Sequence, residues 1–230
     1  MKQIAAILLF LAISLGNTAK AQFDEDQLGA WYMYFWNTSN EKSNWGWQGD
    51  VQFRNWNLGG DLEQLLLRGG LTYVPENTKT KFTLGYGYIQ TGEFGSGTST
   101  VEESRIYQEA LIPHNPGGRF FLKHRFRYEQ RFVQNQDLRT RYRYNLFLNI
   151  PFNGKKIEPG VYYLALYNEL FINGQRNTGT GSVQIFDRNR LYGAVGYHLK
   201  KGLKVQLGMM RQTTDNWDKK QVQLSLHHVW

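Results

Sequence analysis

The chain has 230 residues, no cysteine and a formal net charge of +8 at neutral pH. The length suits one domain, and the lack of cysteine excludes disulfides and thiolate metal sites. A basic protein could bind nucleic acid, but the arginines fall at alternate positions of strand-like segments rather than in a run or on a helix. We therefore expect no nucleic-acid module.

The first segment has the features of an export signal. Lys2 precedes an apolar run over residues 4–15, and the small residues Ala19 and Ala21 mark a cleavage site. The apolar run is shorter than the roughly 17–25 residues that a membrane-spanning helix needs. We expect residues 1–21 to be a signal peptide that is removed, and residues 22–230 to form one outer-membrane β-barrel domain.

Strand-like segments fill the rest of the chain. Many alternate apolar and polar residues, which predicts strands with two different environments. Membrane barrels of this kind have an even number of strands. The sequence shows eleven such segments, so either 28–36 is not a full strand, which gives ten strands, or one further strand lacks the pattern, which gives twelve. We therefore expect an all-β, antiparallel transmembrane barrel of 10–12 strands, with twelve preferred. The eleven predicted segments are 27–36, 44–56, 63–74, 80–91, 104–112, 119–133, 138–150, 160–172, 188–199, 203–212 and 220–230.

The connections between these segments alternate in character. All five prolines and the tight turn at 198–202 are predicted to lie in every other connection, because proline is excluded from the middle of a sheet. The intervening connections, such as 92–104 and 173–187, are polar and often rich in Gly, Ser, Thr and Asn. Short turns at one rim and longer loops at the other are typical of outer-membrane barrels. The pattern favours such a barrel over a soluble periplasmic sandwich.

The chain ends on an aromatic residue, Trp230, after apolar residues at alternate positions such as Leu224 and Leu226. This resembles the C-terminal strand by which bacterial outer-membrane proteins are recognised for insertion. It implies the barrel-insertion machinery and the outer-membrane lipid of a Gram-negative cell as partners.

Several motifs together resemble a known family. They are Arg54, GYGY at 85–88, ESR at 103–105, KHRFRYEQRF at 123–132, RTRYRY at 139–144, IPF at 150–152, NELFIN at 168–173 and DRNRLY at 187–192. They resemble a large outer-membrane barrel family described as domain of unknown function 2490, over essentially the whole mature chain. The resemblance implies the fold and no activity, so it carries over no catalytic residues.

Charged residues of the strands are predicted to face the lumen. The basic ones include Lys123 and Arg188, and Asp50, Glu63, Glu103 and Asp187 are acidic partners. They could form a structural ion-pair lattice that fills a small barrel, or a porin-like basic lumen that attracts a small anionic solute. Ten to twelve strands lie nearer to the closed case. The predicted lumen network comprises Arg54, Arg68, Arg105, Glu109, Arg125, Arg127, Glu129, Arg131, Arg139, Arg141, Arg143, Glu169 and Arg190.

The segments 120–132 and 138–150 carry one inward acid, Glu129, among many arginines. Unpaired buried charges are costly, so they must be paired or wetted. We expect the balancing charge to come from across the barrel, from Glu109, Glu169 and Asp50.

Ser225 and His227 share the inward face and could serve a lipid hydrolase, but residues two apart on a strand are separated by roughly 7 Å, which is loose for a direct hydrogen bond. The five histidines have no metal-ligand spacing, so we expect no metal and no cofactor.

The favoured function is a structural or passive transport role without enzymatic activity. The alternatives are a hydrolase using Ser225 and His227, or a partner-binding protein acting through the loop at 173–187.

Overall fold

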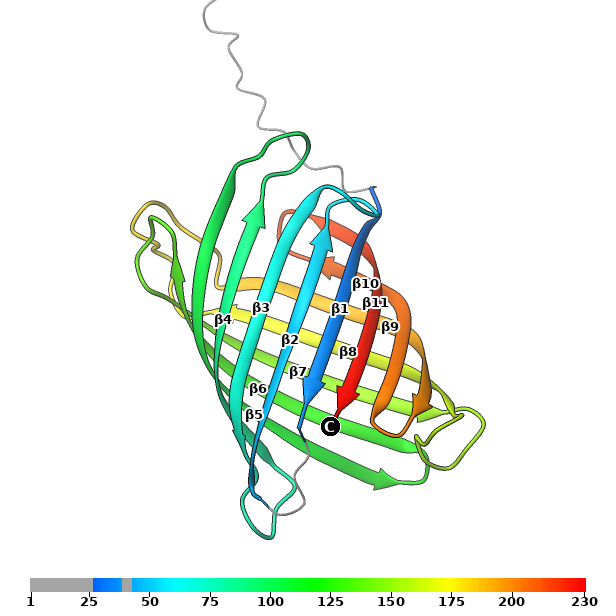
Figure 1. Cartoon of the computed structure of the whole chain (residues 1–230). Coiled ribbons are helices and arrows are strands. Elements are labelled where there is room, and N and C mark those ends of the chain that lie inside the picture. Colours follow the sequence, from blue (N-terminus) through cyan, green and yellow to red (C-terminus); the bar gives the residue numbers. More distant parts are fainter. Residues whose placement is uncertain (1–26, 39–42) are drawn as a thin grey trace, which may run out of the picture.

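A computed structural model of the chain describes residues 27–38 and 43–230. The predicted signal peptide lies outside this part. The described residues form one closed β-barrel (Figure 1), and none of them belongs to a helix long and apolar enough to cross a membrane. The strands are β1 Gly29–Asn37, β2 Trp45–Asn55, β3 Leu62–Tyr73, β4 Lys81–Gly92, β5 Thr100–Gly117, β6 Phe120–Val133, β7 Arg139–Pro151, β8 Tyr162–Asn173, β9 Phe186–Lys200, β10 Leu203–Thr213 and β11 Asp218–Val229.

The barrel closes through a parallel pair. Strands β1 and β11 run side by side in the same direction, from Gly29 opposite Gln221 to Asn37 opposite Val229 (Figure 1). All other neighbouring strands are antiparallel. The predicted range of 10–12 strands is confirmed, whereas the expected even number is wrong, because the segment at 28–36 is a full strand. A parallel closing pair leaves neither edge unpaired although the strand number is odd.

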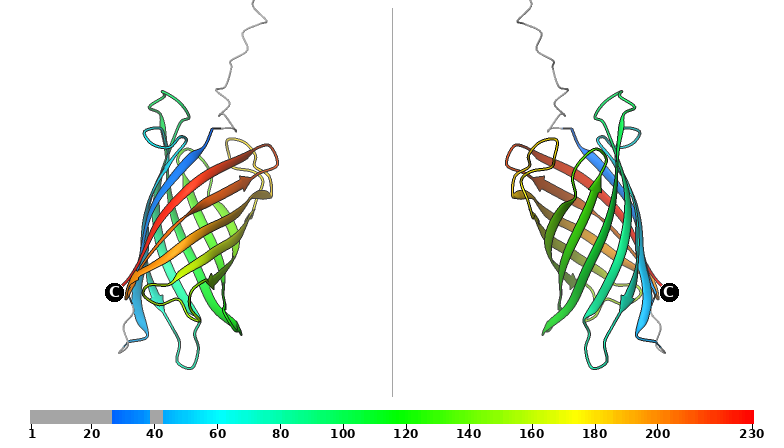
Figure 2. Two further views of the ribbon diagram at one scale, coloured as in Figure 1. Left: turned by 90° about the vertical axis from the view of Figure 1, so that its right-hand side faces the viewer. Right: turned by 90° about the vertical axis from the view of Figure 1, so that its left-hand side faces the viewer.

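Connections of two kinds gather at the two ends of the barrel, whose strands are strongly tilted in both side views of Figure 2. The rim at the end of β11 carries two-residue turns at 118–119 and 201–202. We call it the turn rim. The opposite rim carries the twelve-residue connection 174–185 between β8 and β9. The two predicted sets of connections fall at opposite ends, but their lengths overlap, because the turn rim also carries the ten-residue connection 152–161 and the opposite rim the four-residue connection 214–217.

Three prolines lie inside strands, which corrects their predicted placement in connections. Pro113 and Pro116 belong to β5, and Pro151 ends β7. Strand β4 pairs with β5 only as far as Leu111, so the last residues of β5 pair with β6 alone. Proline is tolerated there because a strand with one open edge does not need every N–H donor.

Alternation along the strands separates two surfaces. On the inside, Glu129 is 1 % exposed, whereas Leu84 on the outside is 59 % exposed. Among the described residues, buried polar and charged side chains outnumber buried apolar ones, and large apolar side chains are exposed on nearly every strand. The interior also needs glycine: a Cβ on Gly85 would lie 2.1 Å from the Tyr107 ring, which belongs to its partner residue on β5.

Candidate functional site: the ion-paired barrel interior

The predicted lumen residues lie inside the barrel. All of the predicted network is buried except Arg125 and Arg139, which are half-buried. Arg139 lies near the rim opposite the turn rim and donates a hydrogen bond to Gln136 at 3.0 Å. Of the other predicted interior acids, Asp50, Glu63 and Glu103 are buried and Asp187 is half-buried. The interior is therefore a dense layer of charged side chains projecting from the strands.

The centre of this layer is Glu129 on β6. Its carboxylate accepts two hydrogen bonds from Arg141, at 2.9 and 2.6 Å, and one from Arg143 at 2.6 Å. Glu169 on β8 continues the chain of contacts by accepting from Arg143 at 2.9 Å and from Arg125 at 2.7 Å. Each carboxylate thus links two guanidinium groups, which is the arrangement that makes a buried charge tolerable.

Opposed positions on neighbouring strands supply several of the other ion pairs. Glu109 lies opposite Arg127 in the β5–β6 register, and the two side chains approach to 2.6 Å. Asp50 and Arg68 are likewise opposed on β2 and β3, with 2.9 Å between them.

Glu103 holds two arginines, Arg105 at 2.6 Å on its own strand and Arg131 at 2.5 Å on β6. Asp187 on β9 accepts from Arg141 at 2.9 Å. Two of the expected balancing acids, Glu109 and Glu169, do pair with arginines of β6 and β7, but they project from the nearby strands β5 and β8 and not from across the barrel. Asp50 pairs with Arg68 on β3 and with no arginine of β6 or β7 within the described residues, so this part of the expectation is wrong.

Aromatic rings between the guanidinium groups form a part of the interior that the sequence analysis did not identify. The guanidinium carbons of Arg54 and Arg190 lie 3.8 and 4.8 Å from the Trp31 ring centre. Arg143 lies 4.4 Å from the ring centre of Phe171. Such cation–π contacts favour a buried guanidinium without a counter-charge. Alternation with Glu169 could have placed Phe171 inside, whereas Trp31 gives no comparable signal.

Ser225 and His227 meet in the interior. The Ser225 hydroxyl lies 2.9 Å from His227 Nε2, so the expectation that this spacing is too loose for a hydrogen bond is wrong. The strand rise separates backbone positions, whereas the imidazole reaches back toward the preceding inward residue. The His227 ring stacks on Phe35, and no carboxylate in the described part of the chain contacts it. The described residues also contain no group of three potential metal ligands.

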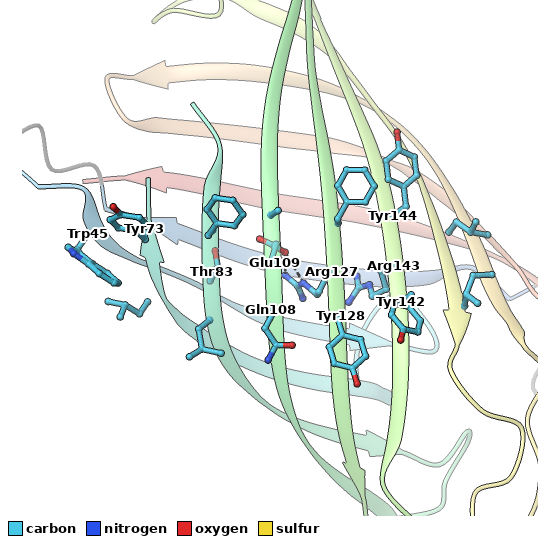
Figure 3. A pocket seen from close by; sticks show the side chains of 17 residues that line it. Trp45, Tyr73, Thr83, Gln108, Glu109, Arg127, Tyr128, Tyr142, Arg143 and Tyr144 are labelled. Atoms are coloured by element: carbon cyan, nitrogen blue, oxygen red, sulfur yellow. Dashed lines mark hydrogen bonds and ion pairs between the residues drawn. The ribbon is translucent and has the colours of Figure 1, made fainter. Parts of the chain in front are cut away.

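The outer wall carries a hollow of about 790 Å³ that spans strands β2 to β8. Figure 3 shows its aromatic lining, including Trp45, Tyr128 and Tyr142. The ion pair of Glu109 with Arg127 belongs to the other side of the same strands. One wall therefore presents an apolar surface outward and a charged surface inward.

Fold and interior together define a closed β-barrel with inward-facing ion pairs and an apolar outer surface. The family model described as "Protein of unknown function (DUF2490)" matches residues 28–223, so the chain belongs to this family. No curated protein and no solved structure matches the chain.

Proposed function

We propose that the mature chain is an outer-membrane β-barrel with a structural role, whose interior is closed to steady flow of solutes. The observation that carries the proposal is the distribution of polarity: interior side chains are mostly polar or charged, and large apolar side chains cover the outside. A barrel in water places its apolar side chains inside, whereas a barrel in lipid places them outside.

Exposed aromatic residues at the turn rim support a membrane location. They lie at strand ends or in the turns of that rim, and they are Trp45, Phe120, Phe152, Tyr162 and Trp230. Amphipathic rings favour the boundary between lipid and water, and aromatic girdles flank the apolar band of outer-membrane barrels. The turn rim would then lie at one membrane surface.

Burial of the interior supports a structural role over passive transport. In a water-filled pore the inward side chains would be exposed to solvent, yet Arg127, Glu129 and Arg143 are nearly inaccessible. Their guanidinium and carboxylate groups contact one another directly. A filled interior is the expected result when paired side chains of long arginines occupy a narrow barrel.

The proposed partners are outer-membrane lipid and the barrel-insertion machinery, which would recognise β11 with its outward apolar residues. Cell fractionation tests the location. We expect the mature chain to begin at Gln22, to fractionate with the outer membrane, and to change gel mobility when it is heated in detergent. A soluble periplasmic monomer without a heat-dependent shift would overturn the proposal.

A lipid hydrolase is the second candidate, and the contact between Ser225 and His227 at 2.9 Å favours it. A serine hydrolase also needs a group that orients the histidine and donors for an oxyanion. Within the described residues no carboxylate contacts His227, which instead stacks on Phe35. We therefore assign the pair to the polar packing of the interior.

An assay in which the purified barrel is incubated with phospholipid extracts distinguishes the structural role from the hydrolase. We expect no fatty-acid release above that of Ser225→Ala, which keeps the fold and removes the hydroxyl. Release that the wild type shows and Ser225→Ala lacks would establish the hydrolase. Binding through the loop predicted at 173–187 is tested by shortening the connection 174–185 and comparing partner capture by barrels that still insert.

A further inference from the structure

The interior contains a cavity of about 40 Å³ toward the rim opposite the turn rim. Eight arginines from β2, β3, β5, β6, β7 and β9 line it, together with Gln64, Leu66 and Phe171. We call these eight arginines the arginine cage. Two of them, Arg54 and Arg190, differ from the others in having no carboxylate within 4 Å among the described residues, and the other six are Arg68, Arg105, Arg131, Arg141, Arg143 and Arg188.

The cage carries surplus positive charge. The carboxylates that pair with its members within the described residues are Asp50, Glu103, Glu129, Glu169 and Asp187, fewer than the guanidinium groups. Two of these acids are shared with arginines outside the cage, since Glu169 also pairs with Arg125 and Glu129 lies 3.7 Å from Arg127. Buried charge without a counter-charge is unfavourable. The cage therefore favours an additional anion.

Glutamines, and not carboxylates, accept the hydrogen bonds of Arg54 and Arg190. Arg54 donates to Gln52 at 2.7 Å and to Gln64 at 2.8 Å, and Arg190 donates to Gln212 at 2.6 Å. An amide oxygen accepts a hydrogen bond but supplies no negative charge. These contacts hold the two guanidinium groups in place but add no negative charge, and the Trp31 ring that both groups contact stabilises them only in part.

The carboxylates occupy only one edge of several guanidinium groups. Arg68 binds Asp50, and Arg105 and Arg131 bind Glu103, each through Nε and Nη2. The Nη1 groups of these arginines make no hydrogen bond within the described part of the chain, and they are not among its fully enclosed polar atoms. The same holds for both terminal amino groups of Arg190, whose Nε alone is bonded. The cavity thus has donors on its wall that the protein leaves available.

We propose that the arginine cage binds a small tetrahedral oxyanion of the phosphate or sulfate type. A water molecule needs roughly 10–15 Å³ of cavity volume. A cavity of about 40 Å³ therefore accommodates a small anion and excludes a lipid headgroup or a sugar. Guanidinium groups are the preferred partners of oxyanions because their planar donors match the spacing of the oxygens. The site depends on the interior of the barrel and not on its cellular location.

Calorimetry on the folded barrel in detergent at low salt tests this site, with inorganic phosphate, sulfate and chloride as separate probes. We expect saturable one-to-one binding of phosphate or sulfate and much weaker binding of chloride. Arg190→Gln should weaken binding by about tenfold or more, as expected when a charge-assisted donor is lost. Arg211→Gln is the matched control, because Arg211 is exposed and lies outside the cavity, so its affinity should equal that of the wild type.

If Arg190→Gln does not fold, Arg188→Gln replaces it, since the Arg188 side chain is 25 % exposed and lies at the edge of the cage. It should also weaken binding, and its folding is checked by the heat-dependent gel shift. No binding to the wild type would overturn the proposal, as would equal affinity in the wild type and the cage variants. Because fractionation plays no part in this experiment, its outcome is independent of the proposed membrane location.

Discussion

At the scale of single residues, Glu129 shows how the interior tolerates its charge. It is 1 % exposed and contacts Arg141 and Arg143, which lie on the neighbouring strand β7. The net stability of a buried ion pair is small, but removing one partner leaves the other charge without compensation. The carboxylate of Glu129 therefore adds little stability compared with an apolar pair. Its removal would leave two buried guanidinium groups without a counter-charge.

Glu129→Ala should therefore destabilise the barrel by about 3–5 kcal/mol, because two guanidinium groups lose their shared counter-charge. The free energy of unfolding from urea titrations of the refolded barrel measures this loss. Glu76→Ala is the control, since Glu76 is exposed in the turn between β3 and β4. A similar cost for both variants would mean that the interior ion pairs contribute nothing specific.

The face of the sheet on which each side chain lies could be predicted residue by residue, whereas the ion pairs between strands could not. Alternation alone placed Arg127, Glu129 and Arg141 on one face, because side chains in a strand have period two. Which acid meets which arginine depends on the register between strands. That register follows from connections whose geometry no local pattern reports, so the sequence indicated Glu109 as a balancing acid without identifying Arg127 as its partner.

At the scale of elements, strand positions agree closely with the alternation of the sequence. The main departure is β5, which continues to Gly117 through Pro113 and Pro116. Proline signals the end of two-sided pairing and not the end of the strand, because a strand with one partner needs only half of its hydrogen bonds. The sequence pattern reports side-chain environment, and it carries no information about an overhanging hairpin.

Strand β10 offers a test of the outer surface. Leu207 is 58 % exposed and lies between Val195 and Leu224 on the flanking strands, which are also exposed. Leu207→Arg should cost about 2–4 kcal/mol if this position lies at the bilayer midplane, because a charge then faces lipid. Folding into lipid vesicles, followed by urea titration, measures the cost.

Asn145→Leu is the matched comparison on the inner surface. Asn145 is 2 % exposed, and its carbonyl oxygen has no hydrogen-bond partner within the described residues. Replacing an unsatisfied polar group by an apolar one of similar size is close to neutral. We expect a much smaller loss than for Leu207→Arg, and equal losses would contradict the assignment of the two faces.

At the scale of the whole molecule, closure depends on two segments at opposite ends of the described chain. The parallel pairing of β1 with β11 fixes the odd strand number and places the start of β1 and the end of β11 at opposite rims. The even number was expected from the usual strand count of membrane barrels. Nothing in the alternation of either segment distinguishes a parallel from an antiparallel neighbour, so the sequence pattern could not correct that expectation. The overall class of fold follows from the sequence, whereas its closure follows only from the pairing.

We propose that ion-paired side chains close the barrel interior to steady flow and leave the cavity of about 40 Å³ in the arginine cage. Conductance of the purified protein in planar lipid bilayers tests it most directly, with insertion verified by the heat-dependent gel shift and an open porin as the positive control. We predict no steady conductance from inserted barrels. Stable anion-selective steps whose selectivity falls in Arg127→Ala or Arg141→Ala would contradict the filled interior and indicate a wet basic lumen, and robust cation-selective conductance would contradict both.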